Sequence, residues 1–250
     1  MRESATGREL LERGAREIGI ALTERQLEQL AVHATALAEW NRRVNLTSVT
    51  DPEAVQTRHF LDSLSCALPL RALLSADRNL TAIDVGSGAG FPGLPLAVAF
   101  PTLQMVLLEA TAKKAEFLEH VVAQLGLPTV SVVHGRAEEL ARRQEHRDRY
   151  DLAFARALAP LPVALELCLP FVRPGGRLVL PRGSDLASQL GAGHAAAREL
   201  GACLLPTLPL TIEGLPPNRA LVVAEKLHPT DGRYPRRVGV AAKRPLGADR

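Results

Sequence analysis

Short apolar segments alternate with stretches of helical character from residue 80 onward. The apolar segments of strand length cover residues 80–85, 103–109, 129–134, 151–155 and 177–180. The helical stretches that separate and follow them cover residues 92–100, 113–125, 136–142, 161–169 and 185–200. Strands that alternate with helices indicate a mostly parallel sheet with helices on both faces, a doubly wound α/β fold. Two further strands, 203–210 and 221–226, follow without a helix between them, so we expect an antiparallel pair at one edge.

The residues before this region have a helical pattern. Residues 23–26 (Thr-Glu-Arg-Gln) have the form of a capping box, and apolar residues recur at helical spacing after them. Asp51 and Pro52 mark another helix start, and residues 59–68 favour a further helix. We therefore expect an N-terminal helical segment packed on the core (1–76), an α/β domain (77–227) and a basic C-terminal tail (228–250).

The composition is that of an ordinary globular protein, with 250 residues, 46% of them apolar and 23% charged. No apolar run approaches the roughly 18 residues that a membrane span needs. The charged first ten residues lack the apolar core of a secretory signal. The three cysteines lie scattered among apolar neighbours, which favours buried thiols in a reducing cytoplasm over disulfides or a metal site.

The positive charge is concentrated at the C-terminus. Residues 226–250 hold seven basic and two acidic side chains, a net charge of +5, and the rest of the chain sums to −2. A basic tail on a near-neutral body is typical of a contact with a polyanion. The alternative is a solvated end that contributes only to solubility.

A glycine-rich loop at residues 86–93 follows the first predicted strand and opens a helix. Such a loop brings backbone N–H groups close to a ligand at the carboxyl end of the sheet. Glu109 closes the second strand 23 residues after Gly86, where an acid accepts hydrogen bonds from ribose hydroxyls. This pair fits either a nicotinamide dinucleotide or S-adenosylmethionine.

The register of the glycines favours the methyl donor. A dinucleotide fingerprint would need a glycine where Phe91 stands, and the match that begins at Gly88 is two residues late. Asp84 places a carboxylate at the entrance of the cofactor site, where it repels a pyrophosphate and attracts the ammonium of a methionyl ligand. Glu138, after the third strand, can accept the amine of adenine; the alternative is a first-turn charge that complements the helix dipole.

Six segments together resemble one family, the guanine-N7 methyltransferases of bacterial small-subunit (16S) ribosomal RNA (RsmG, also called GidB). They are residues 41–48 (NRRVNLTS), 58–64 (RHFLDSL), 84–95 (DVGSGAGFPGLP), 135–138 (GRAE), 156–157 (RA) and 234–239 (YPRRVG). The resemblance covers almost the whole chain. It implies a Rossmann-like class I methyltransferase fold, S-adenosylmethionine as cofactor, and methyl transfer to N7 of a guanosine in 16S rRNA.

The resemblance also implies a cofactor pocket, lined by Gly86, Gly88, Phe91, Glu109, Ala110, Thr111, Ala137, Glu138 and Arg156. Phe91 would pack on the cofactor; its alternative role is a core aromatic under the loop. Arg156 ends a strand beside the expected point of methyl transfer, which makes it a candidate for positioning; its alternative role is a satisfied ion pair. The catalytic residues are otherwise unknown from the sequence; guanine N7 carries a free lone pair, so the implied reaction needs no general base.

Basic side chains supply the candidate RNA contacts, which are Arg42, Arg43, Arg58, His59, Arg182, Arg233, Arg236 and Arg237. Arg182 stands where the family is expected to have a lysine, so its role is open. Nine aromatic residues are too few for a stacking platform, and we expect phosphate contacts to dominate. For Arg58, His59 and Asp62 the alternative is a network that ties the helical segment to the α/β domain.

Two other functions stay open on the residues alone. The late glycine match favours a nicotinamide-dependent (NAD) oxidoreductase, and loss of the reaction would leave a non-catalytic rRNA-binding assembly factor. The predicted partner is 16S rRNA, as the small subunit or its assembly intermediate, with no membrane and no obligate protein partner. The predicted location is cytoplasmic.

Overall fold

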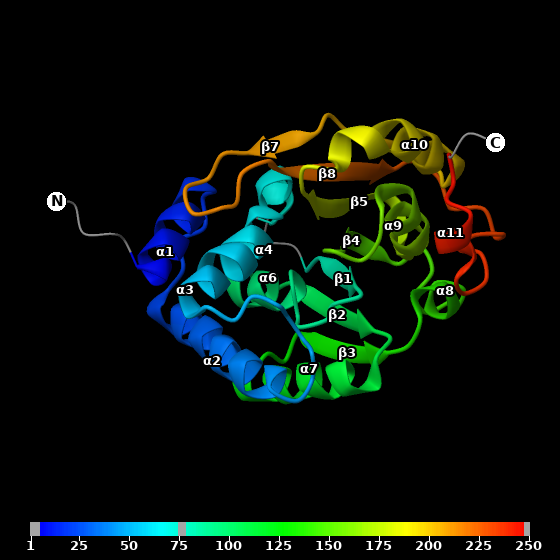
Figure 1. The fold of residues 1–250 in the computed structure, drawn as a ribbon. Helices are drawn as coiled ribbons and strands as arrows, with labels where there is room; N and C mark the ends of the chain where they lie inside the picture. The colour runs from blue at the N-terminus through cyan, green and yellow to red at the C-terminus, as the bar shows by residue number, and fades with distance from the viewer. Residues whose placement is uncertain (1–5, 75–78, 248–250) are drawn as a thin grey trace.

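The computed structural model describes residues 6–74 and 79–247, whose strands form a twisted sheet between two layers of helices (Figure 1). The parallel strands are β1 (Thr81–Val85), β2 (Gln104–Glu109), β3 (Val130–His134), β4 (Tyr150–Phe154) and β5 (Val172–Arg182). Beside β5 runs the antiparallel strand β8 (Arg219–Lys226), and β6 (Ala202–Leu204) forms the edge, so the sheet order is β3-β2-β1-β4-β5-β8-β6. The predicted doubly wound α/β fold with an antiparallel edge is confirmed.

The closing edge differs in detail from the prediction. The segment expected as one strand at 203–210 forms two short strands, β6 (Ala202–Leu204) and β7 (Leu208–Leu210), which both pair with β8. Pro206 lies between them and has no backbone N–H to donate, so the ladder is interrupted there. Strand β5 begins at Val172 and ends at Arg182, so it is longer than the predicted 177–180. Its pairing with β4 shifts register between Val172 and Arg177.

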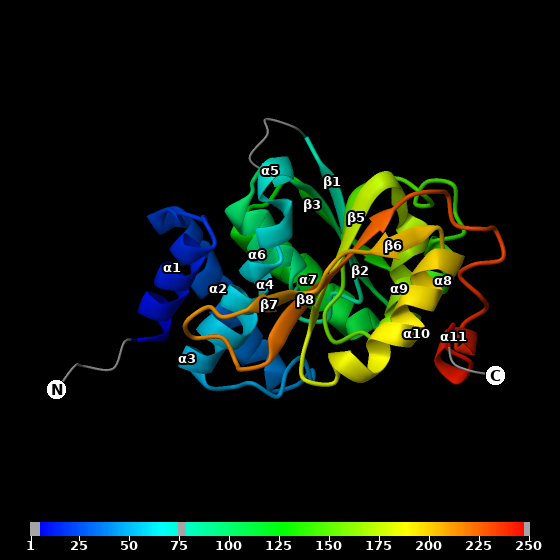
Figure 2. The same cartoon turned by 90° about the horizontal axis from the view of Figure 1, so that it is seen from above.

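Helices cover both faces of the sheet (Figure 2). One face carries α6 (Gly93–Ala99) and α7 (Ala112–Leu125), and the other carries α8 (Ala137–Leu140), α9 (Leu161–Cys168) and α10 (Leu186–Glu199). Two apolar clusters form the core, one containing Phe117 of α7 and the other containing Leu165 of α9. Burial of these apolar surfaces is the main force that holds the layers together.

The N-terminal segment is helical as predicted. Its elements are α1 (Gly7–Glu17), α2 (Glu24–Asn41), α3 (Pro52–Val55), a π-helical turn (Gln56–Leu61), α4 (Asp62–Ser65), a 3-10 turn (Leu68–Leu70) and α5 (Arg71–Leu74). Thr23 caps α2 through the predicted capping box with Gln26, and the Asp51 side chain caps α3.

This segment packs directly on the sheet. Phe60 and Leu64 have no exposed surface, and they belong to the same apolar cluster as Leu107 of β2. The boundary predicted between residues 76 and 77 lies outside the described residues, so the division into domains stays a prediction. Within the described residues, no helix combines the length and apolar character that crossing a bilayer requires.

The chain after β8 packs against the α/β domain. Residues 228–247 run past α8 and α9 and include the short helix α11 (Val240–Lys243) (Figure 1). Tyr234 is buried here, with 4% of its surface exposed. Within the described residues, the segment predicted as a basic C-terminal tail therefore contributes to the packed structure.

Candidate functional site

The glycine-rich loop joins the carboxyl end of β1 to α6. Gly86 and Gly88 have φ angles of 74° and 57°, a backbone conformation that side chains other than glycine rarely adopt. The N–H groups of Gly86 and Ser87 both donate to Leu108 O on the neighbouring strand, at 2.8 and 3.0 Å. The loop is thus fixed at the edge where parallel sheets bind their ligands.

Glu109, at the end of β2, is fixed next to this loop. Its side chain accepts hydrogen bonds from Gly88 N (Oε2, 2.9 Å) and from Thr111 N (Oε1, 2.8 Å). The residue is 6% exposed. Each carboxylate oxygen keeps lone-pair capacity for a further donor, such as a ribose hydroxyl.

Asp84 lies beneath the loop and not at its entrance, which corrects the sequence interpretation. The residue has no exposed surface, and Oδ2 accepts a hydrogen bond from Gly93 N at 3.0 Å. Its Oδ1 atom is buried and has no partner among the described residues. Burial raises the pKa of the Asp84 carboxyl to about 7. An unpartnered carboxylate oxygen here, with Glu109 beside it, fits a nucleoside that carries a cationic group.

The end of β3 lies against the end of β2. Gly135 N donates to Glu109 O at 2.9 Å, and the His134 ring is 3.2 Å from Ala110 O. Ala137 and Glu138 begin α8 two residues later, and both are half-buried. The structure therefore brings Glu109, Ala110, Thr111, Ala137 and Glu138 to one edge of the sheet.

Phe91 is part of an aromatic cluster. Its ring stacks between His33 and His59, with centroid distances of 4.9 and 4.5 Å, and 4% of the residue is exposed. This position matches the alternative role of a core aromatic beneath the loop. Contact of Phe91 with a cofactor stays a prediction.

Both histidines of this cluster are held neutral. Burial, with the nearby charge of Arg156, lowers the pKa of His59 to about 4, and burial lowers that of His33 to about 4. His59 Nδ1 lies 2.9 Å from the Arg156 guanidinium and 3.2 Å from Arg58 O, and Nε2 lies 2.8 Å from Thr47 Oγ1. Since a guanidinium can only donate, its hydrogen bond to Nδ1 favours the neutral tautomer with the proton on Nε2.

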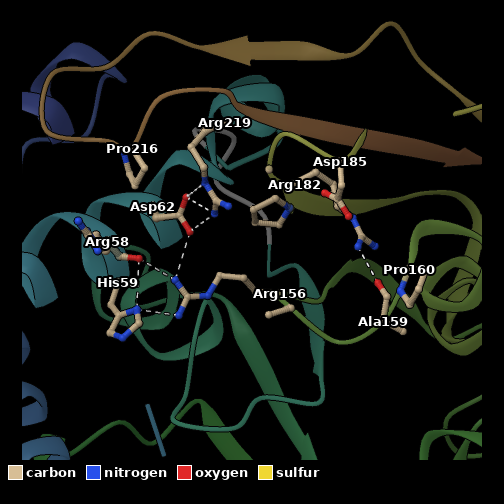
Figure 3. Close-up of a pocket in the computed structure, with 13 residues that line it drawn as sticks. Arg58, His59, Asp62, Arg156, Ala159, Pro160, Arg182, Asp185, Pro216 and Arg219 are labelled. Atoms are coloured by element: carbon tan, nitrogen blue, oxygen red, sulfur yellow. Dashed lines mark hydrogen bonds and ion pairs between the residues drawn. The ribbon is translucent and has the colours of Figure 1, made fainter. Parts of the chain in front are cut away.

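Arg156 follows β4 and joins a charged network (Figure 3). Its Nη1 atom donates to Asp62 Oδ2 at 3.1 Å and to Arg58 O at 2.9 Å. Asp62, on α4, is 1% exposed and also accepts from Arg219 Nε at 2.9 Å. The predicted alternative for Arg58, His59 and Asp62, a network that ties the helical segment to the α/β domain, is therefore present in the structure.

Arg219 was missed by sequence reasoning. It begins β8, far along the chain from Asp62, and no motif surrounds it. Arg156 bonds one carboxylate oxygen of Asp62 and Arg219 bonds the other. Two guanidinium groups therefore lie on either side of one carboxylate (Figure 3).

A cleft of about 590 Å³ opens beside this network. Its lining residues are Arg58, His59, Asp62, Arg156, Ala157, Ala159, Pro160, Pro181, Arg182, Gly183, Asp185, Pro216 and Arg219. Arg182 donates from Nη1 to Ala159 O at 2.7 Å, and burial lowers its pKa. Four arginines against two aspartates give the cleft a net positive charge, which suits an anionic ligand.

The other basic candidates lie in different settings. Arg42 and Arg43 are exposed at the end of α2, and the Arg43 guanidinium lies 4.4 Å from the centre of the Trp40 ring. Arg233 and Arg237 are both exposed, and the Arg233 guanidinium lies 3.5 Å from the Glu199 carboxylate.

Not every basic residue counted in the C-terminal charge is free to contact a polyanion, which corrects the interpretation of that charge. Lys226 is 1% exposed, and its ammonium donates to Leu169 O and Val172 O. The Arg236 guanidinium pairs with Glu166, which has no exposed surface. Lys226 and Arg236 are therefore engaged in contacts within the fold.

The sheet order, the glycine loop and the acid that closes β2 define a class I methyltransferase fold. A crystal structure of the antibiotic-resistance methyltransferase Kmr shares this fold, with a TM-score of 0.50 and 18% identity over 63% of this chain and 92% of that one. The sequence model of the GidB family, described as rRNA small subunit methyltransferase G, matches residues 26–208. The chain belongs to this family, which confirms the resemblance stated from the sequence.

Curated relatives agree over almost their whole length. Ribosomal RNA small subunit methyltransferase G of Roseiflexus sp. (strain RS-1) is 46% identical over 93% of this chain and 97% of the relative. The protein of that name from Roseiflexus castenholzii is 46% identical over 91% of this chain and 95% of the relative. Family membership disfavours the two alternatives left open by the residues, an oxidoreductase and a non-catalytic assembly factor.

Proposed function

We propose that this protein transfers a methyl group from S-adenosylmethionine to N7 of a guanosine in 16S rRNA of the small ribosomal subunit. One observation carries the proposal: Arg156 lines the arginine-rich cleft, and its guanidinium also lies 5.0 Å from the ring centre of Phe91, a residue of the glycine-rich loop. The cofactor loop and the cleft therefore share one wall. A nucleotide in the cleft would lie next to the methyl donor.

The residues at the carboxyl edge of the sheet would hold the cofactor. Gly86 and Gly88 allow close approach of the backbone, and Glu109 accepts the ribose hydroxyls. Ala137 and Glu138 lie where the adenine edge is expected. When the Asp84 carboxyl beneath the loop is ionised, its negative charge favours a positively charged ligand.

The bound cofactor supplies a methyl group on a positively charged sulfur. Guanine N7 has an unprotonated lone pair, so no side chain has to remove a proton. This chain contributes alignment, which is worth up to ~7–11 kcal/mol in well-oriented reactions. The Asp62 carboxylate and the neutral His59 ring fix Arg156, and a fixed guanidinium is suited to positioning the guanosine.

Binding of the RNA is proposed to rest on phosphate contacts. Arg58 and Arg182 line the cleft, and Arg42 and Arg43 extend the positive surface along α2. The scarcity of aromatic residues argues against base stacking as the main contribution. The substrate is the small subunit or its assembly intermediate, and it implies a cytoplasmic location.

The test is methyl transfer from tritiated S-adenosylmethionine to purified small subunits and to naked 16S rRNA from cells that lack the protein. We expect label in the RNA, and mass spectrometry of the digested RNA should identify N7-methylguanosine. Transfer to another atom would overturn the choice of N7. Absence of transfer to either RNA substrate would overturn the proposed function.

A further inference from the structure

The segment that follows β8 is fastened to the domain by arginine side chains from outside it. Arg142 Nη2 donates to Pro235 O at 2.5 Å. Arg147 donates to Tyr234 O at 2.9 Å and to Thr230 O at 2.6 Å. Because these arginines donate to main-chain carbonyls, they fix the path of the backbone in this segment.

A buried ion pair fixes the same segment from the other side. Glu166 of α9 accepts from Arg236 at three donor atoms: the backbone N (2.8 Å), Nε (2.9 Å) and Nη2 (2.5 Å). Glu166 has no exposed surface, so losing this partner would leave a buried carboxylate without its counter-charge. The position of residue 236 is therefore strongly constrained.

Three residues later the segment reaches the cofactor edge. Gly239 N donates to Glu138 Oε1 at 3.3 Å, and Gly239 has a φ angle of 78° that turns the chain into α11. No described residue donates a hydrogen bond to the other oxygen of Glu138. Glu138 lies three residues after Gly135, whose backbone N–H donates a hydrogen bond to the backbone carbonyl of Glu109 at the end of β2.

We propose that residues 228–247 form a strap that positions Glu138 to read the adenine of the cofactor. In this arrangement Arg236 is a positioning residue, which acts through Gly239, and Glu138 Oε2 is the oxygen left for the exocyclic amine. The inference rests on the proposed function, because it assumes that an adenosyl ligand occupies this edge. It assigns to the strap a role in donor binding, where the charge pattern had suggested RNA binding.

The experiment measures calorimetric binding of S-adenosylhomocysteine to the full chain. We compare the wild type with Arg236→Ala, Gly239→Ala, Glu138→Ala and the double variant Arg236→Ala/Glu138→Ala. The matched control is Lys243→Ala, which removes one exposed positive charge from the same segment. A methyl side chain at Gly239 would meet no atom within 4 Å, so that variant strains only the local turn and leaves the buried ion pair in place.

Gly239→Ala keeps the backbone N–H but strains the positive φ that directs it at Glu138. We expect this variant and Arg236→Ala each to weaken binding about fivefold, the size of one hydrogen bond between Glu138 and the ligand, and Lys243→Ala to leave binding unchanged. Arg236→Ala should have no further effect in the Glu138→Ala background, because no carboxylate is left there for the segment to position. Wild-type preference for S-adenosylhomocysteine over its inosine analogue should fall in the same two variants.

Several results would overturn the proposal that the strap positions Glu138. They are unchanged affinity in Gly239→Ala, fully additive losses in the double variant, or an unchanged preference for adenine. Should Arg236→Ala fail to fold, Gly239→Ala and Glu138→Ala still decide the question. Failure of the wild type to bind S-adenosylhomocysteine would instead overturn the proposed function itself, so the two failures are distinguishable.

Discussion

Asp62 and Arg219 are 157 residues apart in the chain, yet their side chains form an ion pair with an Nε–Oδ1 distance of 2.9 Å. Asp62 belongs to the N-terminal helices and Arg219 to the antiparallel edge of the sheet. Arg156 contacts the same carboxylate from the middle of the sheet. One buried acid thus connects three parts of the fold at the wall of the cleft.

Replacing Asp62 with alanine should destabilise the protein strongly. The change leaves Arg156 and Arg219 facing each other without their shared anion, and breaking a buried pair typically costs about 3–5 kcal/mol. The measurement is the free energy of unfolding in urea. The control is Glu213→Ala, which breaks an exposed pair with Arg13 and should cost about 0–1 kcal/mol. A loss for Asp62→Ala as small as that of the control would contradict the buried network.

Glu109→Ala should weaken binding of the methyl donor by roughly 1–3 kcal/mol without unfolding the protein. The variant loses the predicted ribose contact and releases the N–H groups of Gly88 and Thr111. Calorimetry with S-adenosylhomocysteine measures the change, and Glu116→Ala on the exposed side of α7 is the control. Unchanged affinity would remove Glu109 from the cofactor site.

Stability should depend on pH through His33. Burial holds its folded pKa at about 4, below the usual value of 6.5, so the unfolded chain binds a proton that the folded chain excludes. Its contribution to stability is therefore present above pH 6.5 and is lost as the pH falls toward 4, by at most about 3 kcal/mol.

His59, whose pKa is also lowered to about 4, acts in the same direction as His33. Asp84 acts in the opposite direction, because its raised pKa makes its contribution fall as the pH rises toward 7. Comparison of His33→Gln with the wild type isolates the part that belongs to His33, and we expect the variant to reduce the pH dependence of the unfolding free energy between pH 4 and 6.5. His194→Gln, at an exposed site on α10, should leave the dependence unchanged. An identical slope in His33→Gln and wild type would show that His33 titrates normally.

Binding of small-subunit RNA should weaken steeply as salt increases, because phosphate contacts release counterions. Arg58→Ala should reduce affinity and lower the slope of log K against log salt by about 1. Filter binding across a salt series measures both quantities. Arg198→Ala removes an exposed charge from α10 and is the control. A slope that is flat in the wild type would exclude phosphate-dominated binding.

The local features of the fold could be predicted because they depend on residues that are close in the sequence. The capping box of Thr23 and Gln26 formed at the expected position, since its two hydrogen bonds join residues three apart. The strand ending at Glu109 also formed as predicted, because its apolar run has strand length. The single strand expected at 203–210 failed because Pro206 interrupts the ladder, an effect that depends on which partner strand is present.

The α/β order, the glycine loop with its acid, and the family to which the chain belongs could be inferred from the residues alone, because they rest on spacing within short segments. The pairing of Arg219 with Asp62, the stacking of Phe91 between two histidines and the burial of Arg236 against Glu166 became visible in the folded chain. A count of charges treats every arginine alike. Whether a guanidinium meets a buried carboxylate or faces the solvent depends on segments that folding brings together from distant parts of the chain.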